Sequence, residues 1–455
     1  MTGWTRSDVL GVALALLVGG WVTMVALATP VPASDLPTYL ALAREGVWDV
    51  DLWTDLAGSP FVNATLGYQR LCWGLFLLGG WPLLVTVNGL GVGVALGGAA
   101  WLGWRRGAGR GAAAAAFLAS VLVLQNHAAR PQTLAFALAV IGVGLLVGDS
   151  GARWRGLAWA VLLCVWANLH GSFVIGLGLA GCAALRPGQR HVLVAAVLGS
   201  LCTPWGPELF VYVWENSRRP ASRGLAEWGR PGLDAIGLRL WPVLVWSAYR
   251  GWRARPPLWE ALPLLGLALL ACTGVRHAAW VGVVGGPLVA GWLAPRASEV
   301  APPSWRLGLG CAGALTLAGL IRFLPWVAGA PVPDRSSDAW LEGQAPIEAF
   351  DALAGEVEPT RVCVPFGQGG LLRWRLGEGW TVPADVRVWL PDDAGWEAYL
   401  ETRGTAGSCP LLIDRSRAAG LEEQTLRWRE VYRDDRWTVR VPWDHPRRIL
   451  RSAPD

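Results

Sequence analysis

Apolar runs separated by short polar stretches fill the first 330 residues of the chain. They lie at about 9–29, 80–104, 111–127, 131–148, 156–169, 171–185, 191–203, 236–249, 258–274, 278–294 and 307–329. Several approach the roughly 20 residues that an α-helix needs to cross a bilayer, and shorter helices are tolerated where protein covers them. The pattern therefore predicts a mainly α fold, a polytopic transmembrane helix bundle of about eleven spans over residues 1–329.

The pattern changes after about residue 330, where charged and apolar positions mix and no further run is long enough to span a membrane. Residues 361–366, 380–384 and 409–414 have the character of short strands, and residues 392–403 and 420–431 that of helices. The stretch 432–441 predicts a terminal β-hairpin that turns at an Asp-Asp pair. We expect a small α/β domain over residues 330–455.

Composition and the placement of the arginines predict where in the cell the protein lies and how it is oriented. Charged residues make up 16% of the chain, against about 25% in soluble domains. All 39 basic residues are arginines, and threading the spans with a cytoplasmic N-terminus places many of them in short inside loops, as the positive-inside rule requires. We therefore expect a multi-pass protein of the cytoplasmic membrane with an extracytoplasmic C-terminal domain. The net charge of +5 is explained by this orientation and does not indicate a nucleic-acid partner.

With this topology, polar side chains at the helix ends collect on the outer side of the membrane. An ionisable group inside or at the edge of a membrane costs roughly 2.5–3.5 kcal/mol even on lenient scales, so such a collection predicts a site. Arginine and histidine donate charge-assisted hydrogen bonds to phosphate oxygens, and a carboxylate acts as a general base or holds a metal ion. The candidates on this side are Asp35 as the carboxylate and His127, Arg130, Asn168, His170, Glu227, Arg276 and His277 as substrate-binding residues.

A structural interpretation stands beside the functional one for these residues. The segment Asn-Leu-His-Gly at 168–171 is also typical of an ordinary turn between helices, because Asn and Gly both tolerate the left-handed backbone. Arg276 is equally suited to contact lipid head groups. Whether His170 contacts a substrate or only caps its turn stays open from the sequence.

Several motifs, in order along almost the whole chain, resemble those of bacterial polytopic membrane proteins related to the GT-C glycosyltransferases. They are Arg-Pro-Gln at 130–132, Trp-Ala-Asn-Leu-His-Gly-Ser at 166–172, Thr-Pro-Trp-Gly-Pro-Glu-Leu-Phe at 203–210, Ala-Glu-Trp at 226–228, Val-Arg-His-Ala-Ala at 275–279, Gly-Gln-Gly-Gly-Leu-Leu-Arg-Trp-Arg-Leu at 367–376, Asp-Val-Arg at 385–387 and Val-Tyr-Arg-Asp-Asp at 431–435. The resemblance implies a GT-C-like bundle that uses a polyprenyl-phosphate-linked sugar on the outer face. It also implies that Asp35, in the first outer loop (residues 30–70 of the predicted topology), carries catalysis.

The resemblance leaves the activity open between three functions. The first is a glycosyltransferase with a polyprenyl-phosphate sugar donor and membrane lipid as partners; a divalent metal at the carboxylate is an additional option. The second is a non-catalytic component that handles envelope glycan or a lipid carrier on the same scaffold, since the first outer loop departs from the group's pattern. A transporter is disfavoured because the polar residues lie at one face and not at the midplane of the bilayer. The oligomeric state is not indicated.

Two of the eight cysteines, Cys363 and Cys409, fall in the predicted extracytoplasmic domain. Disulfides persist in that compartment, so the pair either forms a disulfide or remains as two buried thiols on neighbouring strands. No Cys-x-x-Cys or Cys/His spacing typical of a zinc site occurs.

Overall fold

A computed structural model describes the greater part of the chain. The described residues are 6–27, 30–32, 34–123, 129–148, 154–222, 228–234, 236–293, 338–341, 345–365, 367–383, 385, 387, 409–416, 425 and 428–446. The chain divides into two compact units, unit 1 (Met1–Thr29 and Gly79–Asp334) and unit 2 (Pro30–Leu78 and Arg335–Asp455). The expected division fell at residue 330 alone, whereas here the segment predicted as the first outer loop belongs with the C-terminal residues to unit 2.

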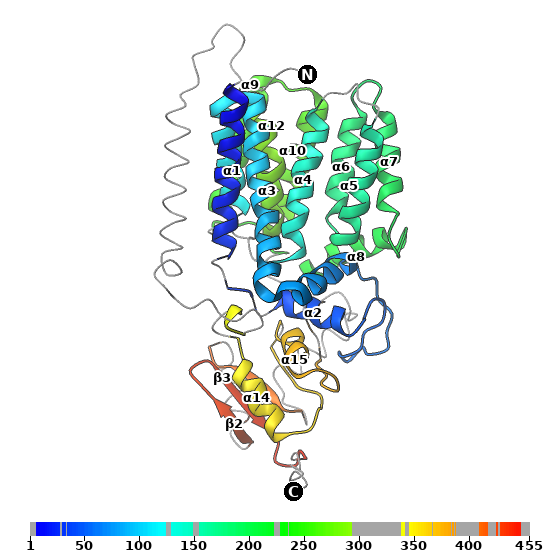
Figure 1. The fold of residues 1–455 in the computed structure, drawn as a ribbon, viewed down its shortest axis with the longest axis vertical. Helices are drawn as coiled ribbons and strands as arrows, with labels where there is room; N and C mark the ends of the chain where they lie inside the picture. Colours follow the sequence, from blue (N-terminus) through cyan, green and yellow to red (C-terminus); the bar gives the residue numbers. More distant parts are fainter. Residues whose placement is uncertain are drawn as a thin grey trace. The chain divides into compact units, whose positions relative to one another are not determined.

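Unit 1 is a helix bundle in which most helices follow the predicted apolar runs, whereas α8 lies in a stretch for which no helix was predicted. Within it α5, α6 and α7 lie side by side (Figure 1). The helices are α1 (Arg6–Leu27), α3 (Leu66–Val123, which begins in unit 2), α4 (Pro131–Val147), α5 (Arg155–Leu169), α6 (Phe173–Ala184), α7 (Arg190–Ser200), α8 (Glu208–Ser222), α9 (Gly237–Ala254), α10 (Leu258–Thr273), α11 (Ala278–Trp280) and α12 (Gly286–Trp292). The predicted break between the runs 80–104 and 111–127 is wrong, because no proline interrupts the arginine-rich stretch and helical backbone continues through it in α3. The run 307–329 lies outside the described residues.

Helices α1 and α3 pack with unusually short separation through small residues. A Cβ atom on Gly93 would lie 2.6 Å from the carbonyl oxygen of Gly19, and one on Gly97 would lie 2.5 Å from that of Ala15. Thr23 Oγ1 donates hydrogen bonds to Gly19 O at 2.8 Å and, across the interface, to Gly89 O at 3.3 Å. Small residues that let two backbones approach in this way are typical of helix packing in membranes.

Two arginines, one at the beginning of α5 and one just after α6, complete the end of α4. Arg155 is 2% exposed and donates to Leu145 O and to Gln189 Oε1. Arg186 Nη1 donates to Gly148 O at 2.7 Å and to a neighbouring carbonyl of the same turn. The last carbonyls of a helix lack intrahelical donors and carry its negative dipole end, so cations are favourable there.

Within the described part of the chain, one helical stretch, Leu66–Gly107, is by itself long and apolar enough to cross a bilayer. Six further apolar helices are shorter, at 10–17 residues. The predicted mainly α fold is confirmed by the helices of unit 1. The number of membrane spans stays a prediction.

The described part of unit 2 combines short helices with a small antiparallel sheet. The elements are α2 (Asp35–Arg44), α14 (Ile347–Glu356), α15 (Gly369–Leu376), β1 (Leu411–Asp414), β2 (Arg429–Arg433) and β3 (Trp437–Val441). The strand order is β1-β3-β2, and both pairs are antiparallel. The predicted terminal hairpin is confirmed: Asp434 Oδ1 accepts the backbone N–H groups of Arg436 and Trp437 and so closes the turn.

Two predictions for the C-terminal segment had different outcomes. The helix expected over residues 420–431 is wrong from Arg429 onward, because these residues pair with β3 as strand β2, and cross-strand pairing overrides local helix preference. The helix expected over residues 392–403 lies outside the described residues. The extended segments near 361 and 381 form isolated bridges, Arg361 with Thr381 and Cys363 with Leu411.

Candidate functional site

Arg276 is the centre of a polar cluster at one end of the unit 1 helices. It belongs to a 3-10 turn, η3 (Val275–His277), between α10 and α11. A buried π-helical turn, η4 (Val281–Gly285), follows α11, and such turns often occur at functional sites. We define the Arg276 cluster as His170, Tyr212, Trp228, Arg276 and His277.

The Arg276 guanidinium is held over an aromatic ring. Its Cζ lies 4.1 Å from the centroid of Trp228, and the ring of His277 meets the same indole edge to face at 5.9 Å. The backbone fixes this arrangement, since Val275 N donates to Gly229 O at 2.9 Å. A guanidinium held on an aromatic face keeps its hydrogen-bond donors in a fixed orientation, and this favours binding of an anionic group.

His170 caps the turn between α5 and α6 and has a defined tautomer. Its Nδ1 accepts the backbone N–H of Ser172 at 3.1 Å and lies 2.7 Å from Ser172 Oγ, which in turn accepts the indole N–H of Trp166 at 3.0 Å. Because Nδ1 is an acceptor, the ring is neutral with its proton on Nε2. Burial, reinforced by the charge of Arg276, lowers the pKa of His170 to about 3. The ring therefore offers an Nε2–H donor without a positive charge.

Tyr212 joins the cluster from α8. Burial raises its pKa, and the nearby charge of Arg276 opposes this shift. Its hydroxyl oxygen accepts a hydrogen bond from Asn216 Nδ2 at 3.4 Å, and Asn216 Oδ1 is buried with no partner among the described residues. The opposite face of α8 is exposed, with Trp214 at 64%. One face of this amphipathic helix thus adds polar groups beside Arg276.

His277 shares the electrostatic environment of His170. Burial and the Arg276 charge lower its pKa to about 4. The cluster therefore carries one permanent cation and two neutral imidazoles, a combination suited to a phosphate group.

Two other predicted residues of unit 1 make structural contacts. Asn168 Nδ2 donates to Cys164 O at 2.8 Å and to Cys202 O at 2.9 Å, so this amide ties α5 to the residues that follow α7. Arg130 precedes α4, and its carbonyl oxygen accepts from Thr133 N and Oγ1. A direct role for either residue with a substrate stays a prediction.

Asp35 lies in unit 2, as the first residue of α2, with a half-buried side chain. The residues that follow it, Leu36 to Ala43, are all buried. A carboxylate in the first turn of a helix is stabilised by the helix dipole. Asp35 is therefore the first residue of a helix whose next eight residues are packed in the interior.

Comparison with known proteins gives a fold but no close relative. No family model matches the chain, and no curated protein does. The crystal structure of ArnT from Cupriavidus metallidurans in the apo state aligns with 95% of this chain and 97% of that chain, with a TM-score of 0.54 and 16% identity. Its complex with undecaprenyl phosphate covers the same shares, with a TM-score of 0.53 and 14% identity. The chain has a GT-C-like fold. The Archaeoglobus fulgidus oligosaccharyltransferase tethered with an acceptor peptide is a more distant match, with 12% identity and a TM-score of 0.47 over 92% of this chain and 70% of that chain.

Within this GT-C-like fold, sequence reasoning found part of the Arg276 cluster. Electrostatic interaction links His170 and His277 with Arg276, as expected for residues at the ends of neighbouring helices. Tyr212 was missed, because the alternating Val-Tyr-Val-Trp at 211–214 does not have the spacing that marks one face of a helix. His127 and Glu227 lie outside the described residues. The residues that the structure describes contain no group of three or more His, Cys, Asp or Glu side chains arranged to hold a metal ion.

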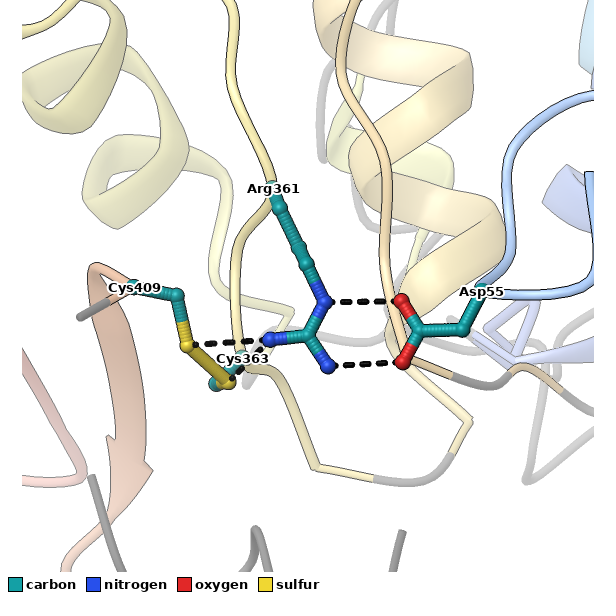
Figure 2. The surroundings of a disulfide bond; sticks show 4 residues. All are labelled: Asp55, Arg361, Cys363 and Cys409. Atoms are coloured by element: carbon teal, nitrogen blue, oxygen red, sulfur yellow. Dashed lines mark hydrogen bonds and ion pairs between the residues drawn. A yellow bond between two sulfur atoms is a disulfide. The ribbon is translucent and has the colours of Figure 1, made fainter. Parts of the chain in front are cut away.

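Cys363 and Cys409 form a disulfide in unit 2. Figure 2 shows Arg361 between this bond and Asp55. Arg361 Nε and Nη2 donate to the two Asp55 oxygens at 2.7 and 2.6 Å, while Nη1 lies 3.7 and 3.5 Å from the two sulfur atoms. The disulfide is thus embedded in a contact between the first outer loop and the C-terminal residues.

Replacing both cysteines by serine is expected to destabilise unit 2 by about 2–4 kcal/mol, because the bond closes a long loop with a sequence separation of 46. Thermal unfolding of the purified protein with and without reductant measures this loss. Reductant should lower the midpoint of the wild type and leave the double variant unchanged. Peptide mass spectrometry without reductant that recovers only free thiols would show that the bond does not form.

Proposed function

We propose that the protein is a membrane glycosyltransferase that uses a polyprenyl-phosphate-linked sugar at the outer face of the cytoplasmic membrane. The observation that carries the proposal is the Arg276 cluster, a cation and neutral imidazole donors gathered in a GT-C-like fold. The ArnT structure of similar fold binds undecaprenyl phosphate. The disulfide supports the placement of unit 2 outside the cytoplasm, where such bonds persist.

In the proposed reaction an acceptor hydroxyl attacks the anomeric carbon of the donor sugar. A new carbon–oxygen bond forms while the bond from that carbon to the phosphate oxygen breaks. Asp35 takes the hydroxyl proton, and polyprenyl phosphate leaves with one additional negative charge. Arg276 and the Nε2–H group of His170 bind the donor phosphate, which is already charged in the bound donor, and they also stabilise the charge that it gains.

Wild-type protein in proteoliposomes tests the proposal. It is supplied with radiolabelled polyprenyl-phosphate sugars of several kinds and with a lipid extract from a strain that lacks the gene, which provides the acceptor. Transfer of label to the extract, with release of polyprenyl phosphate, is expected for one donor. Retained binding of polyprenyl phosphate without transfer from any donor would instead favour a non-catalytic handler of the lipid carrier.

Replacing Arg276 by glutamine is expected to raise the donor KM about 10- to 100-fold, because a hydrogen bond to a charged group contributes about 1.5–3 kcal/mol. Steady-state kinetics over a range of donor concentrations measure this change. Arg230→Gln is the matched control, since Arg230 is an exposed arginine of the segment that carries Trp228. Equal donor KM values for the two variants would remove Arg276 from the donor site.

A further inference from the structure

The contacts of α2 raise the question of what unit 2 does in the proposed reaction. Helix α2 carries Asp35 and lies against α15, and both helices belong to unit 2. An outer domain of this kind is expected to present an acceptor or to cover a site. The contacts of unit 2 indicate another role, in which α15 holds the helix that carries Asp35 in a fixed position.

The first part of the contact is a glycine surface on α15. A Cβ atom on Gly370 would clash with Thr38 Oγ1 and lie 2.7 Å from Thr38 Cα, and one on Gly367 would lie 3.6 Å from Ser34 Cβ. Ser34 and Thr38 are one helical turn apart and flank Asp35. Only glycine at 370 allows the two backbones to approach this closely beside the carboxylate.

The second part is a reciprocal set of polar contacts at the far end of α2. Arg44 Nη1 and Nη2 donate to the carbonyl oxygens of Trp374 and Arg373, both at 2.9 Å, and the Arg44 guanidinium lies over the Trp374 ring at 4.9 Å. In return Arg373 Nε and Nη2 donate to the two Glu45 oxygens at 2.8 Å. The side chains of Arg373 and Glu45 are only 6% and 5% exposed.

These contacts fix the position of α2 along α15 and its rotation. The glycine surface meets the beginning of α2, and the polar pairs meet its end, so the helices run in parallel and neither can slide without breaking a buried ion pair. Removing one partner of a buried pair leaves an uncompensated charge, which is strongly unfavourable. The position of the Asp35 carboxylate is therefore coupled to α15.

We infer that Gly370, Arg373 and Glu45 are positioning residues for the reaction, and that α15 holds the Asp35 carboxylate at its working position. This inference rests on the proposed function. Misplacing a reacting group by about 1 Å lowers rates by as much as 10²-fold, so loosening this contact affects kcat. The donor KM, which we assign to the Arg276 cluster, should change little.

The test compares Glu45→Gln, Arg373→Met and Gly370→Ala with the wild type in the transfer assay and in hydrogen–deuterium exchange. We expect kcat to fall at least tenfold with the donor KM within twofold, and the amides of residues 35–44 to exchange faster. Arg373→Lys, which keeps the charge, should recover part of kcat and shows that the loss is not due to misfolding. Arg375→Met is the matched control, because Arg375 lies on the same helix but pairs with Asp338 and Asp351 at the surface.

The outcomes separate this inference from the function on which it depends. If the wild type transfers sugar and Glu45→Gln and Arg373→Met keep its kcat, the inference is overturned and the function stands. A rise in donor KM equal to the fall in kcat also overturns it. If the wild type transfers nothing, the proposed function fails, and a positioning role for α15 in that reaction fails with it.

Discussion

Replacing Asp35 by asparagine is expected to lower the rate of sugar transfer by a factor of about 10²–10⁴, the usual contribution of a general base. The amide has the shape of the carboxylate but cannot accept the acceptor's proton at neutral pH. The side chain is half-buried in the first turn of α2, so the substitution should leave the fold intact. Single-turnover measurement of label transfer from the donor isolates the chemical step.

Asp49→Asn is the matched control for this variant. Asp49 is another half-buried aspartate of the first outer loop, and its described hydrogen bond is made by its backbone carbonyl, which accepts from Phe61 N at 2.7 Å. We expect the control to keep the wild-type rate. If a strain that carries only Asp35→Asn or Asp35→Ala makes the normal glycan product, Asp35 is not catalytic and the non-catalytic alternative gains support.

The helices of unit 1 were largely predictable because local composition determines them. The runs expected at 131–148, 156–169 and 258–274 correspond closely to α4, α5 and α10. The break expected inside α3 was not predictable in the same way, because arginines and small residues are compatible with both a loop and a continuous helix. Charge marks which side of a membrane a segment faces, and it does not by itself end a helix.

The site was predictable only where its residues stand at helix ends. His170 and Arg276 lie at junctions between apolar runs, which the sequence marks clearly. Tyr212 instead depends on which face of α8 turns inward, and this is decided by packing such as that of Phe210 on Phe173, with ring centroids at 5.2 Å. The hydrogen bond from Ser172 that sets the His170 tautomer also requires the folded turn.

The organisation of unit 2 was the least predictable feature, because its main contacts join residues about 300 positions apart. Arg373 meets Glu45, and Arg387 meets Asp51, across the whole of unit 1 in the sequence. No local periodicity reports such a pairing. The motif Asp-Val-Arg at 385–387 was visible as a resemblance, but its partners in the first outer loop were not.

Replacing Arg387 by methionine is expected to destabilise unit 2 by about 3–5 kcal/mol, because it leaves buried carboxylates without their counter-ion. Arg387 is 2% exposed and bonds to both oxygens of Asp385 and to Asp51 Oδ1 at 2.7–3.0 Å. Its guanidinium also lies 4.9 Å from the Trp53 ring, and Trp53 Nε1 donates to Asp385. For a unit of this size the melting midpoint should fall by about 6–20 °C.

Two further variants decide whether the loss comes from the unpaired charges. Arg375→Met removes an arginine that pairs at the surface, where an ion pair contributes about 0–1 kcal/mol, so its midpoint should stay near that of the wild type. The triple variant Asp51→Asn, Asp385→Asn, Arg387→Met has no buried charge at this position and should recover much of the stability that Arg387→Met loses, since replacing a whole buried ion group is often neutral. If the triple variant is as unstable as the single one, packing of Arg387 on Trp53, and not charge pairing, holds the first outer loop in unit 2.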